Sequence, residues 1–191
     1  MVDFVRVQQA HQQAVDSVFA QQEVIRAITT AMVAALQTGH KVLWCGNGGS
    51  AAEAQHMSAE LMVRYVLNRR PLASIALTTD TSLLTAHSND FEFESIFARQ
   101  IEALGQSGDL LMAMSTSGHS ANILQAVQQA KRQGLTTVAL TGQAPNPLAQ
   151  IADWAICIDS TTTARIQEAH TLVNHLICEG LDAQFKPGEL D

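Results

Sequence analysis

The chain has few cationic residues and no long apolar run, and each shortage argues against a class of protein. Its 191 residues include 11 Lys and Arg against 18 Asp and Glu, giving a formal net charge of −7. This balance leaves no broad basic surface for the phosphate backbone, so we expect no direct nucleic-acid binding. A membrane-spanning helix needs about 18 apolar residues in a row, and the sequence contains no such run and no charged leader. We therefore expect a cytoplasmic protein with no membrane partner.

Cysteine is also scarce. The three present, Cys45, Cys157 and Cys178, lie in apolar surroundings without the C-x-x-C spacing of metal or redox sites. This pattern predicts buried, reduced thiols rather than disulfides. Cys45 ends a short apolar segment, which leaves open a second interpretation as a thiol nucleophile.

Length and composition favour a single domain over residues 1–191. A hydrophobic content of 47% is sufficient for a sizeable core in a chain of this length. Residues 4–38 repeat apolar side chains at helical spacing, which predicts two helices or one long bent helix. We therefore divide the chain into N-terminal helices over 1–39, an α/β core over 40–185 and a loose tail over 186–191.

After residue 40 the pattern changes to five short apolar segments, most of them separated by stretches long enough for a helix. This alternation predicts parallel βαβ units and an α/β fold class. The uniformly apolar residues 110–114 are typical of a strand buried on both faces of a parallel sheet. The predicted strands are 41–45, 74–77, 109–114, 136–140 and 154–158, and the predicted helices after residue 40 are 50–65, 81–87, 93–104, 120–133 and 163–185.

The first strand leads into a glycine-rich loop, Gly46-Asn47-Gly48-Gly49-Ser50. Glycine lets the backbone adopt positive φ and approach a ligand closely, and a helix start offers free N–H groups to an anion. Ser50 and Glu53 form a capping box that would start the helix at residue 50. The loop has neither the spaced glycines of a dinucleotide site nor a Walker lysine, so it serves either a small phosphate group or a simple chain reversal.

A second polar loop, residues 115–120 (Ser-Thr-Ser-Gly-His-Ser), follows the third strand. If the strands have the common order 2-1-3-4-5, strands 1 and 3 flank the point where open α/β sheets bind ligands, and both loops meet in one crevice. Neither loop contains Lys or Arg. Recognition by hydroxyls and helix N-termini therefore favours a small phosphorylated metabolite.

His56 and Glu60 are four residues apart on the helix that follows the first loop. This spacing places both side chains on one helix face. An imidazole beside a carboxylate suits metal ligation or proton transfer. The same pair is also found as an ordinary hydrogen bond on a helix surface, and the spacing alone leaves both interpretations open.

The ordered motifs together resemble the sugar isomerase (SIS) domain family and, within it, the phosphoheptose isomerase subfamily. The resemblance covers essentially the whole chain and is carried by residues 45–50 with Gln55, His56 and Glu60, by Asn89 and Asp90, by 115–118 with Ser120, and by 165–168 with His175. It implies a flavodoxin-like, doubly wound five-stranded parallel sheet in a homotetramer with active sites between subunits. The implied reaction converts sedoheptulose 7-phosphate into D-glycero-D-manno-heptose 7-phosphate, a precursor of the heptose in bacterial lipopolysaccharide.

The resemblance also implies roles for individual residues. Glu60 and His175 would be the catalytic pair, and one Zn²⁺ per subunit would be held by His56, Glu60, Gln167 and His175. Substrate contacts would come from Asn47, Gly48, Gly49, Ser50, Glu60, Asn89, Asp90, Ser115, Thr116, Ser117, Ser120 and Gln167. These types fit the chemistry, because ketose–aldose exchange moves a proton between adjacent carbons through an enediol, and zinc would polarise the carbonyl.

The implied zinc set raises a geometric question. Gln167 and His175 are eight residues apart, about 12 Å along a continuous helix, which is too far for one ion to reach both without strain. Either Gln167 lies in a frayed first turn of the helix, or different subunits complete the site.

Two features depart from the isomerase pattern. Ala164 stands where the isomerases have an acidic residue. Residues 77–80 and the segment 163–168 also resemble a sister subfamily of non-catalytic SIS tetramers that bind the replication initiator DnaA. That subfamily lacks the glutamate and the second histidine that are present here as Glu60 and His175. We therefore prefer the isomerase, with a DnaA-binding regulator and a module that senses sugar phosphate without turnover as the alternatives.

Overall fold

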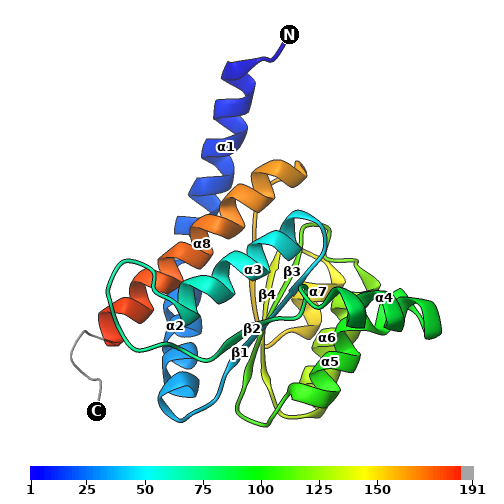
Figure 1. The fold of residues 1–191 in the computed structure, drawn as a ribbon. Coiled ribbons are helices and arrows are strands. Elements are labelled where there is room, and N and C mark those ends of the chain that lie inside the picture. The colour runs from blue at the N-terminus through cyan, green and yellow to red at the C-terminus, as the bar shows by residue number, and fades with distance from the viewer. Residues whose placement is uncertain (186–191) are drawn as a thin grey trace.

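The computed structural model describes residues 1–185, which form a parallel sheet between two helical layers (Figure 1). All four neighbouring strand pairs are parallel, and the order is β2-β1-β3-β4-β5. The strands are β1 (Val42–Gly46), β2 (Ser74–Ala76), β3 (Leu110–Ser115), β4 (Thr136–Thr141) and β5 (Trp154–Cys157). The predicted α/β class, doubly wound sheet and strand order are confirmed. The tail predicted over 186–191 lies outside the described residues.

Successive side chains of the central strands point into two separate hydrophobic cores, as the pleat of a strand requires. In β3, Leu110, Met112 and Met114 face one core, and Leu111 and Ala113 face the other. All six residues of β3 are buried, as the apolar residues 110–114 predict for a central strand.

The two cores divide the helices into layers. The first core is covered by α1 (Phe4–Phe19), α2 (Gln22–Gln37), α3 (Gly49–Met62) and α8 (Thr163–Gln184). The second is covered by α4 (Thr81–Asp90), α5 (Ile96–Leu104), α6 (Ala121–Arg132) and α7 (Pro147–Ile151). A 3₁₀ turn, η1 (Phe93–Ser95), leads into α5. The short α7 is an element that the sequence pattern did not predict, because its five residues are fewer than two turns.

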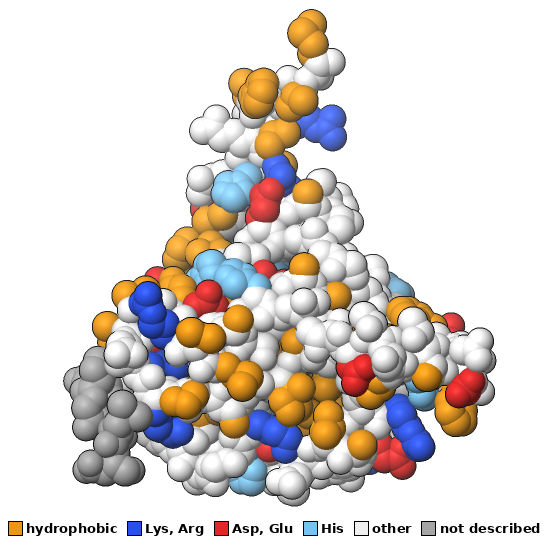
Figure 2. Space-filling model, viewed as in Figure 1, with side chains coloured by type: hydrophobic (Ala, Val, Ile, Leu, Met, Phe, Trp, Pro, Cys, Tyr) orange, Lys and Arg blue, Asp and Glu red, His pale blue; other side chains and the backbone are white. Residues whose placement is uncertain are grey.

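The predicted N-terminal helical arm is present as two helices. The first of them, α1, projects beyond the rest of the molecule (Figure 1), and its only buried residues are Ala14 and Val18. Its projecting end carries the exposed apolar side chains of Phe4, Val5 and Val7 (Figure 2). No helix within residues 1–185 combines the length and the hydropathy needed to span a membrane.

The start of α3 differs from the sequence expectation. The helix begins at Gly49, and its N-cap is Gly48, which has a φ of +56° and supplies no capping side chain. Ser50 lies inside the first turn and is buried, with its backbone N–H bonded to the carbonyl of Asn47 at 3.0 Å. The predicted capping box of Ser50 and Glu53 is therefore wrong, because the positive φ of Gly48 turns the chain into the helix before Ser50 can cap it.

Candidate functional site

The two polar loops predicted to converge lie side by side at the carboxyl ends of β1 and β3. Gly46 of β1 pairs in register with Met114 of β3, so both strands end at the same edge of the sheet. Asn47 and Asn122 join the loops through reciprocal amide hydrogen bonds of 2.9 and 2.8 Å. The Asn47 side chain, predicted to bind substrate, is therefore engaged in holding the first loop to the start of α6.

The second loop is folded around its own hydroxyl groups. Ser115 Oγ lies 2.9 Å from Ser120 Oγ and accepts a hydrogen bond from the backbone N–H of Gly118 at 3.2 Å. Gly118 has a φ of +69°, and a Cβ at this position would lie 2.2 Å from Oδ1 of Asn146, so only glycine fits. Ser120 is the N-cap of α6 but makes no capping bond with its side chain, which leaves N–H groups of the α6 N-terminus available to an anion.

The N-terminal part of α8 reaches the first loop. A Cβ on Gly49 would lie only 2.5 Å from Nε2 of Gln167, so the glycine makes room for this amide. Gln167 lies within α8, which is continuous from Thr163 to Gln184. The suggestion that Gln167 sits in a frayed first turn is therefore wrong.

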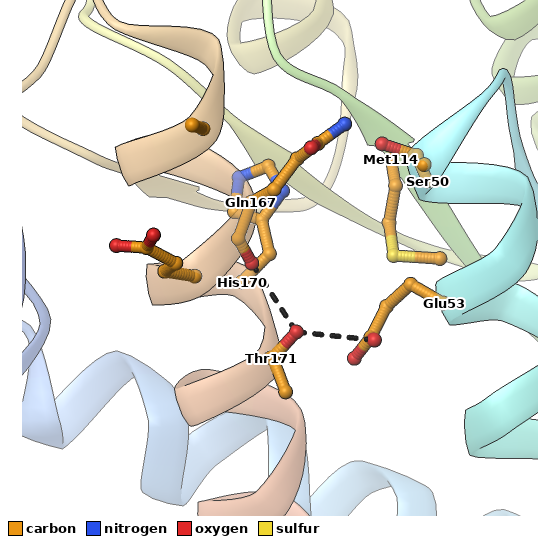
Figure 3. A pocket seen from close by; sticks show the side chains of 9 residues that line it. Ser50, Glu53, Met114, Gln167, His170 and Thr171 are labelled. Atoms are coloured by element: carbon orange, nitrogen blue, oxygen red, sulfur yellow. Dashed lines mark hydrogen bonds between the residues drawn. The ribbon is translucent and has the colours of Figure 1, made fainter.

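A cavity of about 350 Å³ lies between α3 and α8, next to the first loop (Figure 3). The Glu53 side chain lines this cavity and connects α3 to α8. Its Oε2 accepts a hydrogen bond from Thr171 Oγ1 at 3.1 Å, and its Oε1 accepts one from Asn174 Nδ2 at 2.9 Å. These bonds fix α3 to α8. The lining residues are Gly49, Ser50, Glu53, Met114, Ala164, Gln167, Glu168, His170 and Thr171.

Glu53, His170 and Thr171 were not predicted as site residues. Two of them could have been found from spacing, because His170 and Thr171 lie three and four residues after Gln167 and thus share its helix face. Glu53 was assigned to a cap instead, and its contact with α8 depends on how the two helices pack.

The predicted catalytic pair lies around the ring of His56. Nε2 of His56 is 3.3 Å from Oε1 of Glu60, one turn further along α3. The ring of His175, on α8, packs edge-on against the His56 ring with 5.2 Å between centroids. The Tyr65 ring also packs against the His175 ring, with 5.4 Å between their centroids. Figure 2 shows histidine side chains on the molecular face near the junction of α3 and α8. One chain therefore brings Glu60, His56 and His175 together.

The same chain does not assemble the predicted zinc ligands. Gln167 lies at the Gly49 end of the cavity, whereas His175 lies two turns further along α8 beside His56. Within residues 1–185 no group of three or more His, Cys, Asp or Glu side chains converges closely enough to hold a metal ion. The described residues of a single chain thus do not present a complete set of ligands for the ion.

A buried ion pair fixes the helix that carries Glu60. Arg69 donates to the backbone carbonyls of Glu60 and Leu61, both at 2.9 Å, and its Nε donates to Oδ1 of Asp182 on α8, also at 2.9 Å. Asp182 accepts two further bonds from the backbone N–H groups of residues 66 and 67. Both side chains are almost completely buried. Together they hold the C-terminal end of α3 against α8.

Asn89 and Asp90 lie away from this cavity. They form the last turn of α4, where Nδ2 of Asn89 donates to Oδ1 of Asp90 at 2.9 Å and both residues are exposed. Because α4 belongs to the layer on the opposite face of the sheet, one chain does not bring these residues to Gln167. Their predicted contact with substrate remains a prediction.

Cys45 does not fit the alternative role of a nucleophile. Its side chain is completely buried in the second core, and burial raises the pKa of the thiol far above its usual range. A protonated, inaccessible thiol cannot attack a substrate. Burial also raises the pKa of Cys178 to about 12. The three cysteines are free thiols, and Cys45 and Cys178 are buried as predicted, whereas Cys157 is only partly buried.

Comparison with known proteins places these features among sugar-phosphate enzymes. The SIS domain model matches residues 7–142. The chain is 48% identical over 179 residues to a phosphoheptose isomerase of Shewanella sediminis, covering 92% of this chain and 91% of the relative. It is 52% identical over 151 residues to that of Campylobacter concisus, covering 79% and 80%. The solved phosphoheptose isomerase GmhA of Neisseria gonorrhoeae superposes with a TM-score of 0.86 at 39% identity, covering 94% of this chain and 95% of that one.

Proposed function

The chain belongs to the SIS domain family, and we propose that it is a phosphoheptose isomerase, which converts sedoheptulose 7-phosphate into D-glycero-D-manno-heptose 7-phosphate. The observation that carries this proposal is the meeting of Glu60 and His175 around the His56 ring, on the same two helices that enclose the cavity. The alternative regulators that resemble this chain lack a glutamate and a histidine at these positions.

The phosphate group would be held at the carboxyl edge of the sheet. Gly48, the N-cap of α3, carries no side chain, and the α6 N-terminus keeps N–H groups free behind Ser120. Ser117, on the second loop, is exposed and offers a hydroxyl group. Helix N-termini and hydroxyl donors suit a phosphate monoester, whose oxygens accept hydrogen bonds.

The chemical step would use the Glu60 carboxylate as the base. It removes a proton from C1 of the open-chain ketose while His175 supplies a proton to the carbonyl oxygen on C2, which gives the enediol. The base then returns the proton to C2, and the hydroxyl on C1 gives up its proton to the histidine as the C1 carbonyl forms. Each proton removed is returned, so the product is an isomer of the substrate in which the carbonyl has moved from C2 to C1 and C2 has become a new stereocentre.

Zinc and the oligomer are separate parts of the proposal. The ligand set His56, Glu60, Gln167 and His175 is supported by the closeness of His56 to Glu60 and His175, and it requires Gln167 or a substitute ligand from a neighbouring subunit. When bound, Zn²⁺ would polarise the sugar carbonyl. Metal analysis of the purified protein, with loss and recovery of activity on chelation and zinc addition, tests this part.

A homotetramer is supported by the apolar surface at the N-terminal end of the chain. Phe4 and Val5 are exposed on the projecting part of α1, where contact with another subunit would remove them from water. The proposed sites between subunits predict that activity falls with dilution as the tetramer dissociates. Full activity in verified monomers would contradict the proposal that the active sites lie between subunits. Since phosphorylated sugars are charged and do not cross membranes, we place the reaction in the cytoplasm.

The deciding experiment is an isomerase assay on pure protein. Sedoheptulose 7-phosphate is incubated with the protein, with and without zinc, and formation of the aldose is followed. We expect turnover in the wild type and none in Glu60→Gln. Capture of DnaA by a protein that shows no turnover would replace the enzyme with the regulator, and binding of the sugar phosphate without turnover would indicate a sensing module.

A further inference from the structure

One polar atom in the wall of the cavity has no hydrogen-bond partner. His170 is 1% exposed and lines the cavity together with Gln167, one turn before it on α8 (Figure 3). Its Nε2 lies 3.2 Å from the backbone carbonyl of Thr141 at the end of β4. Its Nδ1 is buried and receives no hydrogen bond from residues 1–185.

The tautomer of His170 follows from its one partner. A carbonyl oxygen can only accept, so the ring proton lies on Nε2, and Nδ1 presents a lone pair. Burial lowers the pKa of His170 to about 4, against smaller opposing effects of the Thr141 bond and the Glu53 carboxylate. The ring is therefore neutral at physiological pH, and Nδ1 is an acceptor.

No side chain within residues 1–185 donates a hydrogen bond to this acceptor. The hydroxyl proton of Thr171 is directed to Glu53 or to the carbonyl of Gln167, and Glu53 itself is an acceptor. A buried acceptor without a donor destabilises the folded protein, and native structures rarely keep one without a reason. A bound molecule that carries a donor would remove this cost.

We propose that His170 positions the substrate by accepting, at Nδ1, a hydrogen bond from a hydroxyl group of the bound sugar phosphate. The proposal rests on the isomerase function given above. A hydroxyl is the fitting donor, because a phosphate group at neutral pH offers mainly negatively charged acceptors, which a neutral acceptor does not bind. Nδ1 is covered by surrounding side chains, so the hydroxyl reaches it when one of them turns, and Gln167 is the long, flexible one on the same helix face.

Nitrogen NMR of the histidine rings tests the contact directly. The full-length Glu60→Gln variant is used so that sedoheptulose 7-phosphate is not turned over, and the Gly49 amide reports whether the site is occupied. We expect the sugar phosphate to move both the Gly49 amide and the Nδ1 resonance of His170, and inorganic phosphate to move only the amide. If the sugar moves the amide and leaves Nδ1 unchanged, the role of His170 is overturned and the function stands. If it moves neither, both are overturned.

A matched pair of variants separates positioning from folding. His170→Asn places an amide oxygen near the position of Nδ1, whereas His170→Gln places an amide N–H near Nε2 and keeps only the bond to Thr141. Positioning predicts that kcat/KM falls about tenfold in the Gln variant and much less in the Asn variant. A structural role predicts the reverse order, and that order or equal losses would overturn the proposal. The same two substitutions at His40, which lies next to Gly108 where β1 and β3 begin, at the sheet edge opposite both loops, should leave kcat/KM unchanged.

Discussion

Asn47 and Asn122 bond to each other twice, each amide donating to the oxygen of the other, across 75 positions of sequence. Asn122 is 3% exposed, so it has no access to water if its partner is lost. This pair joins the two polar loops at one edge of the sheet.

We expect Asn47→Ala to lower the free energy of unfolding by about 1–3 kcal/mol, because it leaves the buried Asn122 amide without its partner. Asn122→Ala should lower the free energy of unfolding by a similar amount. The double variant should lower it by clearly less than the sum of the two single variants, since the second change removes a group that is already unpaired. Urea denaturation of the three variants checks this, and strict additivity would show that the pair is not coupled.

Gly49→Ala should impair substrate binding without unfolding the protein. Its Cβ would approach Nε2 of Gln167 to 2.5 Å, and the flexible amide would turn away rather than break the fold. Alanine also favours a helix over glycine by about 1 kcal/mol, so the thermal midpoint should stay constant or rise. We expect kcat/KM to fall by about tenfold. Gly39→Ala is the control: its φ of +86° makes it destabilising, but kcat/KM should not change.

Glu60→Gln and His175→Ala should each lower kcat by about 10²–10⁴-fold, the usual contribution of a positioned acid or base. Both side chains lie around the partly exposed His56 ring rather than in the core, so the thermal midpoint and the oligomer should persist. Glu102→Gln, on the exposed face of α5, is the control and should retain full activity. Normal turnover in either active-site variant would remove that residue from the catalytic pair.

Because His170 is buried, we expect the folded protein to lose stability in mild acid. Burial lowers its pKa from 6.5 to about 4, so between these pH values the unfolded chain binds a proton that the folded protein does not. Stability therefore falls as the pH drops through this window, by about 2 kcal/mol between pH 6.5 and pH 5 for this one group. His170→Gln cannot titrate and should lose less stability over the same interval in urea denaturation. Equal losses in both proteins would contradict the assignment.

Breaking the ion pair between Arg69 and Asp182 should be costly, because both side chains are nearly completely buried. We expect Asp182→Asn to lower the free energy of unfolding by about 3–5 kcal/mol, since it leaves an unpaired buried charge. The exposed pair of Arg99 and Glu102 provides the contrast: Glu102→Gln should change stability by less than about 0.5 kcal/mol. A small effect at Asp182 would show that water or another group compensates the arginine.

The sheet and its two binding loops could be predicted because each depends on local sequence. The apolar residues of β3 indicate a central strand, and the glycines and hydroxyls that follow β1 and β3 indicate ligand loops at one sheet edge. The start of α3 was harder to predict, since Ser50 and Glu53 fit the capping-box pattern as well as the glycines fit an earlier start of the helix. The outcome depended on the positive φ of Gly48, which the sequence permits without requiring.

The cavity could be predicted only in part, because its walls come from distant parts of the chain. Resemblance to a family pointed to Gln167 and His175, but the roles of Glu53 and His170 depend on how α8 packs against α3 and β4. Spacing along the sequence predicted that Gln167 and His175 lie apart, but not that Gln167 would face Gly49 and His175 would face His56. That division depends on the path of one straight helix across the site.

The contacts between α3 and α8 also determine when the site can exist. Glu60 and the glycine loop precede four of the five strands along the chain, whereas His175 and Asp182 follow all five. During synthesis the sheet can therefore form before the residues that complete the site have emerged. Isomerase activity should consequently require α8 to have emerged, and a chain that ends before α8 should have none.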